Sequence, residues 1–422
     1  MRKVHFFPIP GYCSIMSGMV SGPSNGRERC ERATAHLDPP FAVVDLDAFD
    51  SNARDLVRRA DGVPIRVVTK SLRCRYLIDR VLSRPGFRGV MCYSLPEALW
   101  LHQAGTSDDI LVAYPTADRG ALRALAADEN ARRHITITVD EAGHLNFIDT
   151  VLGDGHPDIR VSLELDVSWR PFTRGPVVQV GTWRSPLREP AVAALFAETI
   201  VKRPGFTLTG VMGYEGQIAG LGDAPPGHPM RGALLRAVQA RSGRELNERR
   251  AETVRRIRAL TDLEFVNGGG TGSLESTSAD TSVTEIAAGS GLVGPTLFDT
   301  YRKFCPRPAL RFALPVVRRP APGIATLFSG GYVASGTGVP NRLPKPFFPA
   351  GLRLTRSEGA GEVQTPVIGE AADSLRVGDR VWLRHAKGGE LAERLTEYHL
   401  IGAEQPDAKA VPTYRGEGQC FG

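Results

Sequence analysis

Lys70 stands at the end of a short apolar segment typical of a β-strand, Pro-Ile-Arg-Val-Val-Thr at residues 64–69. A lysine amine held at the end of a buried strand can attack an aldehyde and form a Schiff base. Taken alone, Lys70 is better explained as a solvated lysine that ends a strand. Its chemistry therefore depends on what else the fold brings near it.

Two glycine-rich segments occur later in the chain, and each follows a strand-like run. The first is Leu-Glu-Phe-Val-Asn-Gly-Gly-Gly-Thr-Gly-Ser at residues 263–273, and the second is Thr-Glu-Ile-Ala-Ala-Gly-Ser-Gly at residues 284–291. Backbone N–H groups in such loops can converge on a phosphate, which glycine lets approach closely. The loops after strands seven and eight of a (β/α)8 barrel are a common place for such a site. The residues of these two segments that we expect to contact the phosphorylated ligand are Asn267, Gly269, Gly270, Thr271, Gly289 and Ser290.

A lysine that faces a phosphate site across a barrel suggests a phosphorylated aldehyde cofactor. Two further strand ends supply candidate partners. Tyr214 ends the sixth strand-like run, where its phenol can hydrogen-bond or stack on a cofactor ring, although a packed rim tyrosine is about as consistent. The fifth run leads to Arg170 and, beyond a Pro/Gly-rich insertion, to Arg184. One of these two guanidinium groups can hold a phenolate or a carboxylate.

The elements that must position these residues alternate regularly. Eight apolar strand-like runs are separated, in most cases, by helical patterns with apolar residues three and four positions apart. This alternation predicts an α/β fold with a closed, TIM-like (β/α)8 barrel, and an open doubly wound sheet is the alternative. The eight runs are Ile65–Thr69, Gly89–Tyr93, Ile110–Tyr114, Ile135–Val139, Val161–Val167, Leu208–Tyr214, Glu264–Asn267 and Glu285–Ala288.

After Asp299 the alternation stops, and residues 305–405 are rich in proline, glycine and short β-like runs. We expect a mostly antiparallel β domain there, with which the first strand, Phe41–Leu46, can pair. The predicted division is an N-terminal extension over 1–37, expected to be loosely ordered, a barrel over 38–304 and a C-terminal β domain over 305–422.

The composition excludes several classes of protein. Hydrophobic residues make up 42% and charged residues 23%, which is ordinary for a globular protein. The net charge of +6 comes from scattered arginines, so we expect no nucleic-acid partner. No apolar run approaches the length of a membrane span, and the six cysteines show no CxxC spacing. We expect a cytoplasmic protein with no membrane partner.

From about Pro39 to Gly418 the chain resembles the fold-type III pyridoxal-phosphate (PLP) enzymes, which pair an alanine racemase-like barrel with a β domain. It is most similar to the D-threonine aldolase and D-serine dehydratase group, in its amino acid deaminase/aldolase branch. The segments that carry the resemblance are Val68-Thr69-Lys70-Ser71, the Gly-Gly-Gly-Thr-Gly loop at 268–272, residues 284–290 and 298–301, and two β-domain segments at 361–366 and 384–390.

The resemblance implies PLP on Lys70, catalytic roles for Lys70, Arg184 and Tyr214, and cofactor contacts from Tyr214 and the glycine loops. Arg184 fits the family's Gly-x-x-Arg pattern better than Arg170 does, with residues 171–180 as an insertion. In relatives, a His-x-Cys or His-x-Asp pair in the β domain binds a divalent metal. Here the pair is His385 and Lys387, and a protonated lysine is no ligand. His385 is therefore the candidate metal ligand of a doubtful site, to which Glu390 can add a carboxylate.

The implied activity is that of a lyase for D-configured β-hydroxy amino acids, an enzyme of D-amino acid metabolism. Aldol cleavage and dehydration use the same cofactor, so the sequence does not choose between them. The alternatives are a non-catalytic PLP-binding protein, a Schiff-base aldolase without PLP and an amino acid racemase. Residues 70–74, Lys-Ser-Leu-Arg-Cys, depart from the racemase pattern Lys-Ala-Asn-Ala-Tyr-Gly. The expected partners are a small amino acid substrate and a second copy in a homodimer.

Overall fold

The computed structural model describes residues 23–172, 178–336, 339–403 and 405–422. Eight parallel strands close into a barrel in chain order, from β2 round to β9. The ring closes where Ile65 and Val67 of β2 pair with Ile286 and Ala288 of β9. This closure confirms the predicted barrel and excludes the open sheet. The strands are β2 (Ile65–Val68), β3 (Phe87–Cys92), β4 (Ile110–Val112), β5 (Ile135–Val139), β6 (Ile159–Glu164), β7 (Phe206–Gly213), β8 (Phe265–Gly268) and β9 (Glu285–Ala288).

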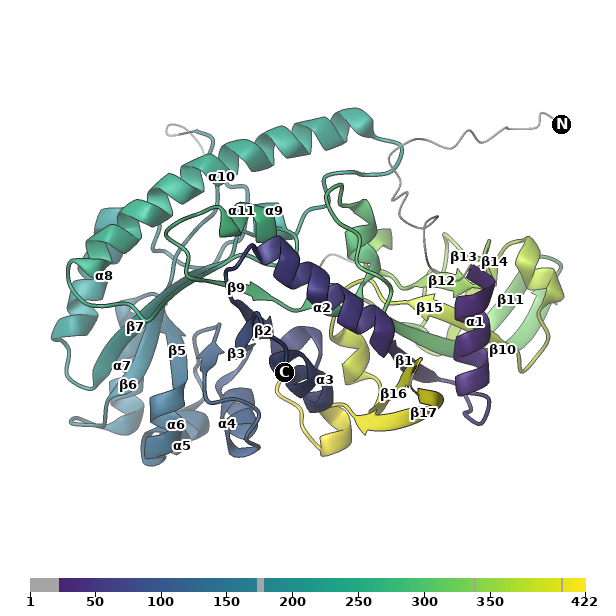
Figure 1. Ribbon diagram of the computed structural model, residues 1–422, viewed down its shortest axis with the longest axis horizontal. Helices are drawn as coiled ribbons and strands as arrows, with labels where there is room; N and C mark the ends of the chain where they lie inside the picture. Colours follow the sequence, from purple (N-terminus) through teal and green to yellow (C-terminus); the bar gives the residue numbers. More distant parts are fainter. Residues whose placement is uncertain (1–22, 173–177, 337–338, 404) are drawn as a thin grey trace.

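Helices surround the barrel because each turns one apolar stripe to the strands. In α2 (Leu46–Ala60) the buried Phe49, Ala53 and Leu56 lie three and four positions apart, and the Asp45 carboxylate caps the helix by accepting from the Ala48 N–H at 3.1 Å. The long helix α10 (Pro229–Arg258) runs over the barrel and packs against α8 (Pro190–Lys202) (Figure 1). The others are α3 (Arg75–Leu82), α4 (Leu95–Gln103), α5 (Arg119–Ala127), α6 (Glu129–His134), α7 (Ala142–Leu152), α9 (Gly216–Ala219), α11 (Leu274–Ser278) and α12 (Ser290–Val293).

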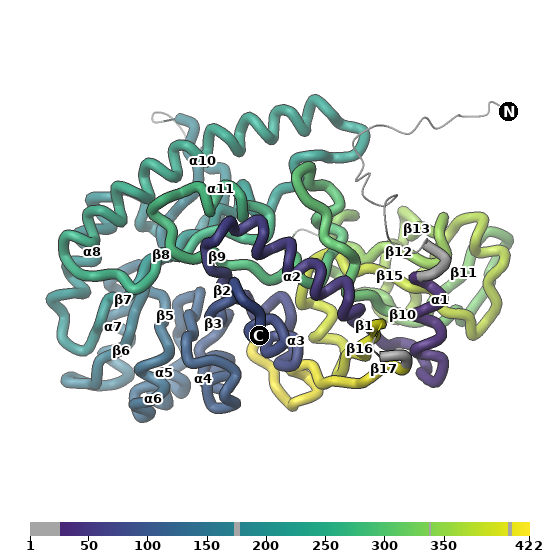
Figure 2. The backbone as a smooth tube through the Cα atoms, in the orientation of Figure 1, coloured from purple at the N-terminus to yellow at the C-terminus, as the bar shows by residue number. Residues whose placement is uncertain are grey.

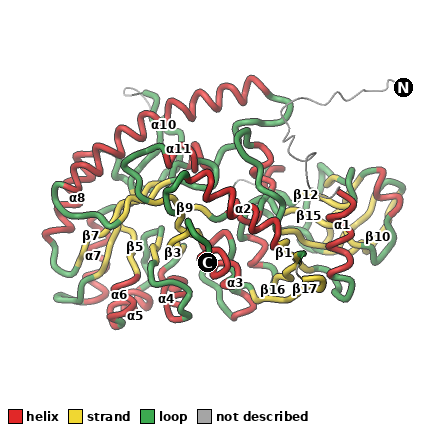
Figure 3. The backbone as a smooth tube through the Cα atoms, in the orientation of Figure 1, coloured by secondary structure: helices red, strands yellow, loops and turns green. Residues whose placement is uncertain are grey.

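A second sheet lies beside the barrel, and all of its strand pairs except β1–β16 are antiparallel. Its main order is β13-β14-β11-β10-β1-β16-β17, and β15 pairs with β10 and β12. Figure 3 shows these strands in yellow on the right of the molecule. The strands are β1 (Phe41–Asp45), β10 (Leu310–Ala321), β11 (Ile324–Phe328), β12 (Lys345–Phe348), β13 (Arg353–Leu354), β14 (Gln364–Ile368), β15 (Arg380–Arg384), β16 (Glu397–Gly402) and β17 (Gln405–Pro412).

The N-terminal strand β1 is a member of this second sheet, as the sequence suggested. It lies between β10 and β16, where Val43 pairs with Arg311 on one side and His399 on the other. The tube in Figure 2 shows the purple start of the chain reaching the yellow end of it. Both ends of the chain therefore build the β domain.

Part of the expected extension is a helix. Residues 1–22 lie outside the described ranges, but α1 (Pro23–Ala33) packs on the second sheet through Cys30 and Ala33. The indole Nε1 of the fully buried Trp382 donates to Glu31 Oε1 at 2.8 Å. The expectation of a loosely ordered segment over 1–37 is thus wrong for α1. This helix is hard to predict from the sequence, because charged residues dominate it and its apolar contacts are few.

The Trp382 contact makes a measurable prediction. Trp382→Ala removes a buried ring that lies edge-on to Phe41 at 5.6 Å between ring centroids. We expect the free energy of unfolding to fall by about 3–5 kcal/mol, measured in a denaturant titration. Trp183, which is 70% exposed, provides the matched control, because Trp183→Ala should change stability by less than about 0.5 kcal/mol. Equal effects of the two substitutions would contradict the packing described for α1 and β1.

Candidate active site

A cavity of about 310 Å³ opens at the carboxyl ends of the barrel strands. Its apolar floor is formed by Met91, Ala113, Met212 and Ala287, which pack together inside the barrel. The second domain closes one side of it with residues near 335 and over 387–390. The strand-end position is where barrels place their active sites, and here two domains share it.

Lys70 lines this cavity from the turn Thr69–Ser71 that directly follows β2. Its Nζ donates a hydrogen bond to the Tyr114 Oη at 2.7 Å. Tyr114 follows β4 and was not among the predicted site residues. Burial alone would raise the pKa of its phenol, but the Lys70 ammonium and the Arg184 guanidinium outweigh burial and lower it. Lys70 and Tyr114 are therefore a pair across which a proton can move.

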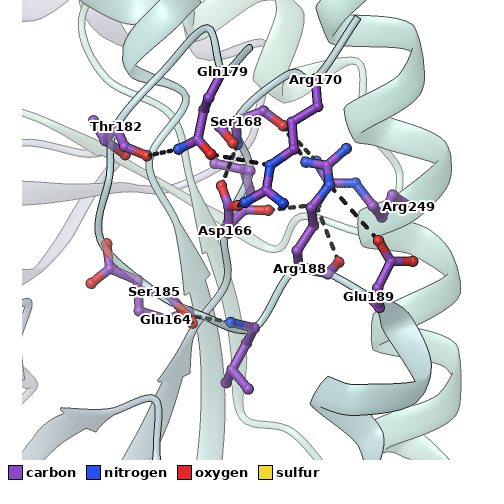
Figure 4. A network of polar contacts seen from close by, with 12 residues as sticks. Glu164, Asp166, Ser168, Arg170, Gln179, Thr182, Ser185, Arg188, Glu189 and Arg249 are labelled. Carbon is purple, nitrogen blue, oxygen red and sulfur yellow. Dashed lines mark hydrogen bonds and ion pairs between the residues drawn. The ribbon is translucent and has the colours of Figure 1, made fainter. Parts of the chain in front are cut away.

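The structure separates the two candidate arginines. Arg184 lines the cavity, where its Cζ lies 5.4 Å from the Tyr114 ring centroid and 5.2 Å from that of Tyr214. Arg170 instead donates to Asp166 Oδ2 at 3.1 Å and to Gln179 Oε1 at 3.1 Å. Figure 4 shows Arg170 turned into this polar network. Arg184 is thus the arginine available to a ligand.

A buried carboxylate lies behind Arg184. Glu164 ends β6, is 3% exposed, and its Oε1 is 3.7 Å from Arg184 Nη1. Burial raises the pKa of Glu164 to about 7, against the opposing effect of the Arg184 charge. The ion pair keeps Arg184 at the cavity wall, because moving Arg184 away would leave the buried Glu164 carboxylate without its charged partner. The sequence analysis did not single out Glu164.

Tyr214 lines the cavity directly after β7. Burial raises the pKa of its phenol, so the ring is neutral over the physiological range. The next residue, Glu215, is buried against Arg250 of α10, with 2.5 Å between Oε1 and Nη1. Its other oxygen, Oε2, accepts the backbone N–H of Gly269. The Glu215 carboxylate therefore fixes the first glycine loop, and through the adjoining backbone it also positions Tyr214.

Both glycine loops line the cavity, but some of the N–H groups predicted to bind a phosphate already donate to other residues of the protein. Asn267, Gly269, Gly270, Thr271, Gly289 and Ser290 all line it. The Gly269 N–H is used by Glu215, and the Gly270 N–H donates to Ser273 Oγ at 3.1 Å. The Asn267 side chain donates to Glu285 Oε1 at 2.8 Å. These residues shape the loop, and their donors are already used within the protein.

Other donors in the loops stay open. Neither Thr271 N–H nor Ser290 N–H has an acceptor within the part of the chain that the structure describes. The hydroxyls of Thr271 and Ser290 lie 3.4 Å apart. Gly270 lets the first glycine loop pack closely against Tyr214 and Ala219, since a Cβ at this position would lie 3.3 Å from the Tyr214 ring and 3.0 Å from the Ala219 Cβ. Open N–H groups beside two hydroxyls suit an anion, as the sequence predicted for this place.

The doubtful metal site is not assembled around His385. His385 is 3% exposed and does not line the cavity, and its ring interacts with the Leu310 backbone without a well-formed hydrogen bond at either nitrogen among the described residues. Burial, with the nearby Arg384 charge, lowers the pKa of His385 to about 3. Within the described ranges, no group of three or more His, Cys, Asp or Glu side chains is placed to hold a metal. The residues present do not fit the divalent metal implied by the resemblance.

Two glycines of the second domain pack closely against the backbone of the Lys70 turn. A Cβ on Gly389 would lie 1.8 Å from the Lys70 carbonyl oxygen, and one on Gly388 would lie 3.1 Å from that of Ser71. Gly389 also has a φ of +95°, which L side chains rarely adopt. Only glycine allows this approach, so segment 387–389 reaches the cavity wall beside Lys70.

The residues of the cavity fit a phosphorylated aldehyde that carries an aromatic ring. Lys70 supplies an amine, Thr271 and Ser290 supply open donors for the phosphate, and Arg184 faces Tyr214 above an apolar floor. Tyr114, which was not predicted, lies just beyond the end of β4, so its position relative to the strand is the signal that could have found it. Glu164 and Glu215 act through buried contacts that no spacing in the sequence reveals.

Fold and site together define a barrel in which the Lys70 amine and two glycine-rich loops line one cavity, with the second of these loops directly beside the Lys70 turn. The chain belongs to the alanine racemase N-terminal domain family, whose model matches residues 44–294. This confirms the predicted family. In addition, no helix within the described ranges is long and apolar enough to cross a membrane.

Individual relatives agree with this assignment. The chain is 27% identical over 258 residues to a D-threonine aldolase of Arthrobacter sp., and the match covers 61% of each chain, so it spans about three fifths of that relative's length. A D-threonine aldolase structure from Filomicrobium marinum superposes with a TM-score of 0.72 at 20% identity, over 90% of this chain and 96% of that one. D-threo-3-hydroxyaspartate dehydratase from Delftia sp. HT23 gives 0.67 at 21% identity, over 89% and 97%. These structural similarities concern the fold.

The crowding at Gly389 can be tested against a matched glycine. Gly378 has nearly the same φ, +96°, but an added Cβ there would meet nothing within 4 Å. Gly378→Ala should cost about 1–2 kcal/mol of stability from backbone strain alone. Gly389→Ala should cost a further ~1–3 kcal/mol or more, because its Cβ collides with the Lys70 backbone. Unfolding midpoints in denaturant measure both, and equal losses would contradict the close contact between the domains.

Proposed function

We propose that this protein is a PLP-dependent lyase that acts on D-configured β-hydroxy amino acids, with aldol cleavage as the first candidate reaction. One observation carries the proposal: the Lys70 amine and the open donors of the two glycine loops face a single cavity. Family membership and the sequence similarity to a D-threonine aldolase support it. PLP bound through its aldehyde withdraws electrons from the bonds at the α-carbon of an amino acid.

In this proposal the cofactor is held from three sides. Lys70 Nζ would hold the aldehyde carbon, Thr271 and Ser290 would bind the phosphate, and Arg184 would hold an anionic oxygen of the ring or of the substrate. Glu164 positions Arg184 by their ion pair. Tyr214 lies beside the glycine loop, where its neutral ring limits how far an aromatic ligand can shift.

Proton movement is assigned to Lys70 and Tyr114. When the Lys70 amine is free, a proton passes between Nζ and the Tyr114 Oη along their 2.7 Å hydrogen bond. The lowered pKa of Tyr114 brings the phenol nearer to working pH and makes this exchange easier. The apolar floor of Met91, Ala113, Met212 and Ala287 limits water below the reacting carbon.

Dehydration is the second candidate reaction, favoured by the structural similarity to a D-threo-3-hydroxyaspartate dehydratase. A non-catalytic PLP carrier is less well supported, because the β domain contributes Lys387 and Glu390 to the cavity. The cytoplasmic homodimer expected from the sequence is part of the proposal and rests on the family resemblance.

A substrate screen tests the function directly. The protein is incubated with D- and L-threonine, D- and L-serine and D- and L-3-hydroxyaspartate, and the products are identified. We expect turnover of at least one D-isomer, giving glycine and an aldehyde for aldol cleavage, or a 2-oxo acid and ammonia for dehydration. Turnover of L-isomers alone, interconversion of D- and L-forms, or no turnover of any of them by protein with bound PLP would contradict the lyase proposal.

The cofactor lysine is tested separately. Protein with PLP should absorb near 420 nm (roughly, for a protonated PLP imine), and borohydride followed by peptide mapping should place the pyridoxyl group on Lys70. Lys70→Ala should lose the band, whereas Lys202→Ala, at an exposed lysine of α8, should keep it. A label on another lysine would refute the role given to Lys70, even if turnover were found.

A further inference from the structure

Lys387 is a cation of the cavity that no carboxylate neutralises at close range. Four cationic side chains line the cavity: Lys70, Arg73, Arg184 and Lys387. Arg73 is paired with Glu393, and Arg184 with Glu164. Among the described residues, Lys387 forms no ion pair with Asp or Glu, and Glu390, whose charge acts on Lys387, accepts instead from the Ser335 N–H. Lys70 is already assigned to the cofactor aldehyde, which leaves Lys387 as the cavity cation that has neither an assigned role nor an ion-pair partner among the described residues.

The Lys387 ammonium is fixed in place by its neighbours. Nζ donates to the Ser335 carbonyl oxygen at 3.0 Å, and the Ser335 N–H donates to Glu390 Oε1 at 3.1 Å. Ser335 is therefore held from both sides by residues of the 387–390 segment. An ammonium has three N–H bonds, and only one of those of Lys387 has an acceptor among the described residues. Two donors remain for a group in the cavity.

The backbone beside Lys387 is fixed as well. Gly388 lies against Ser71 and Ser290, and Gly389 lies against the Lys70 carbonyl oxygen. Lys387 thus projects from the wall that carries the cofactor lysine. The Lys70 charge acts on Lys387, so a charged donor on this wall lies near whatever is attached at Lys70.

The same segment fails as a metal site. His385 is buried outside the cavity lining, while Lys387, two residues later, is part of it. The segment therefore presents a fixed ammonium to the cavity and keeps the imidazole out of it. A positive charge placed on an oxygen of the substrate stabilises negative charge that develops there, whether a metal or an ammonium carries it.

We propose that Lys387 binds the oxygen on the β-carbon of the substrate and takes the place of a divalent metal ion at that oxygen. This inference rests on the function proposed above and names the residue that recognises the β-hydroxyl. The interaction is a charge-assisted hydrogen bond from Nζ to the β-oxygen, with no covalent bond made or broken at Lys387. It stabilises the oxygen in aldol cleavage as its proton leaves, and in dehydration as the C–O bond breaks.

Two ligands that differ by one hydroxyl isolate this contact. D-Threonine carries the β-oxygen, and D-2-aminobutyrate has the same carbon skeleton without it. Binding to the PLP-loaded protein is followed by the initial change in cofactor absorption, before turnover. Lys387→Met should weaken D-threonine on the order of tenfold or more, the usual effect of losing a hydrogen bond to a charged group. It should leave D-2-aminobutyrate within about twofold.

Three controls make the test decisive. Lys387→Arg, which keeps the charge, should retain more D-threonine affinity than Lys387→Met, and Lys202→Met should match the wild type. Equal weakening of both ligands by Lys387→Met, or of neither, would overturn the inference. A stoichiometric divalent metal in the wild type whose removal weakens D-threonine would overturn it too. Absence of any cofactor absorption band from the wild type would instead refute the proposed function, on which this inference rests.

Discussion

Arg250 holds together the parts of the barrel that make the site. Its guanidinium is 2% exposed and lies between the carboxylates of Glu215 and Asp280, at 2.5 and 2.8 Å. Burial alone would lower the pKa of Arg250, but the two carboxylates raise it, so the group stays charged. Glu215 follows Tyr214 and fixes Gly269, while Asp280 precedes β9. Loss of either partner would leave a buried charge unpaired, which is among the most destabilising changes a core can undergo.

The cavity combines this rigid back wall with an excess of positive charge at its face. Lys70, Arg184 and Lys387 gather within one small space, where Glu164 and Glu390 balance only part of their charge. Such an arrangement is costly in an empty site and favourable once a phosphate and a carboxylate enter. The chemistry of the proposed ligands therefore supplies the charge balance that the protein lacks.

The sequence predicted the barrel because each strand is a short, buried apolar run, and all eight predicted runs overlap the strands β2 to β9. Lys70, which follows the end of β2, and Arg184, which lies well beyond the end of β6, both line the cavity. In the second domain the β-like runs of the sequence, at 310–314, 323–327, 351–354, 363–367 and 380–383, overlap β10, β11, β13, β14 and β15. They leave out β12, β16 and β17, whose mixed polar and apolar residues show little alternation. The sequence also predicted that the N–H groups of both loops bind a phosphate. It could not show that the Gly269 N–H already donates to Glu215, because no spacing in the sequence reveals this contact.

The central position of β1 in the second sheet has a consequence for how the chain becomes folded. β1 pairs with β10 and β16, which lie more than 260 and 350 residues further along the chain. During synthesis from the N-terminus, Phe41 stays without its partner Ala313 until β10 has been made, and Val43 stays without its second partner, His399, until β16 has been made. The barrel strands between them can assemble earlier. The β domain, and with it the wall that carries Lys387, is therefore the last part of the molecule that can form, so an incomplete chain carries Lys70 without its second wall.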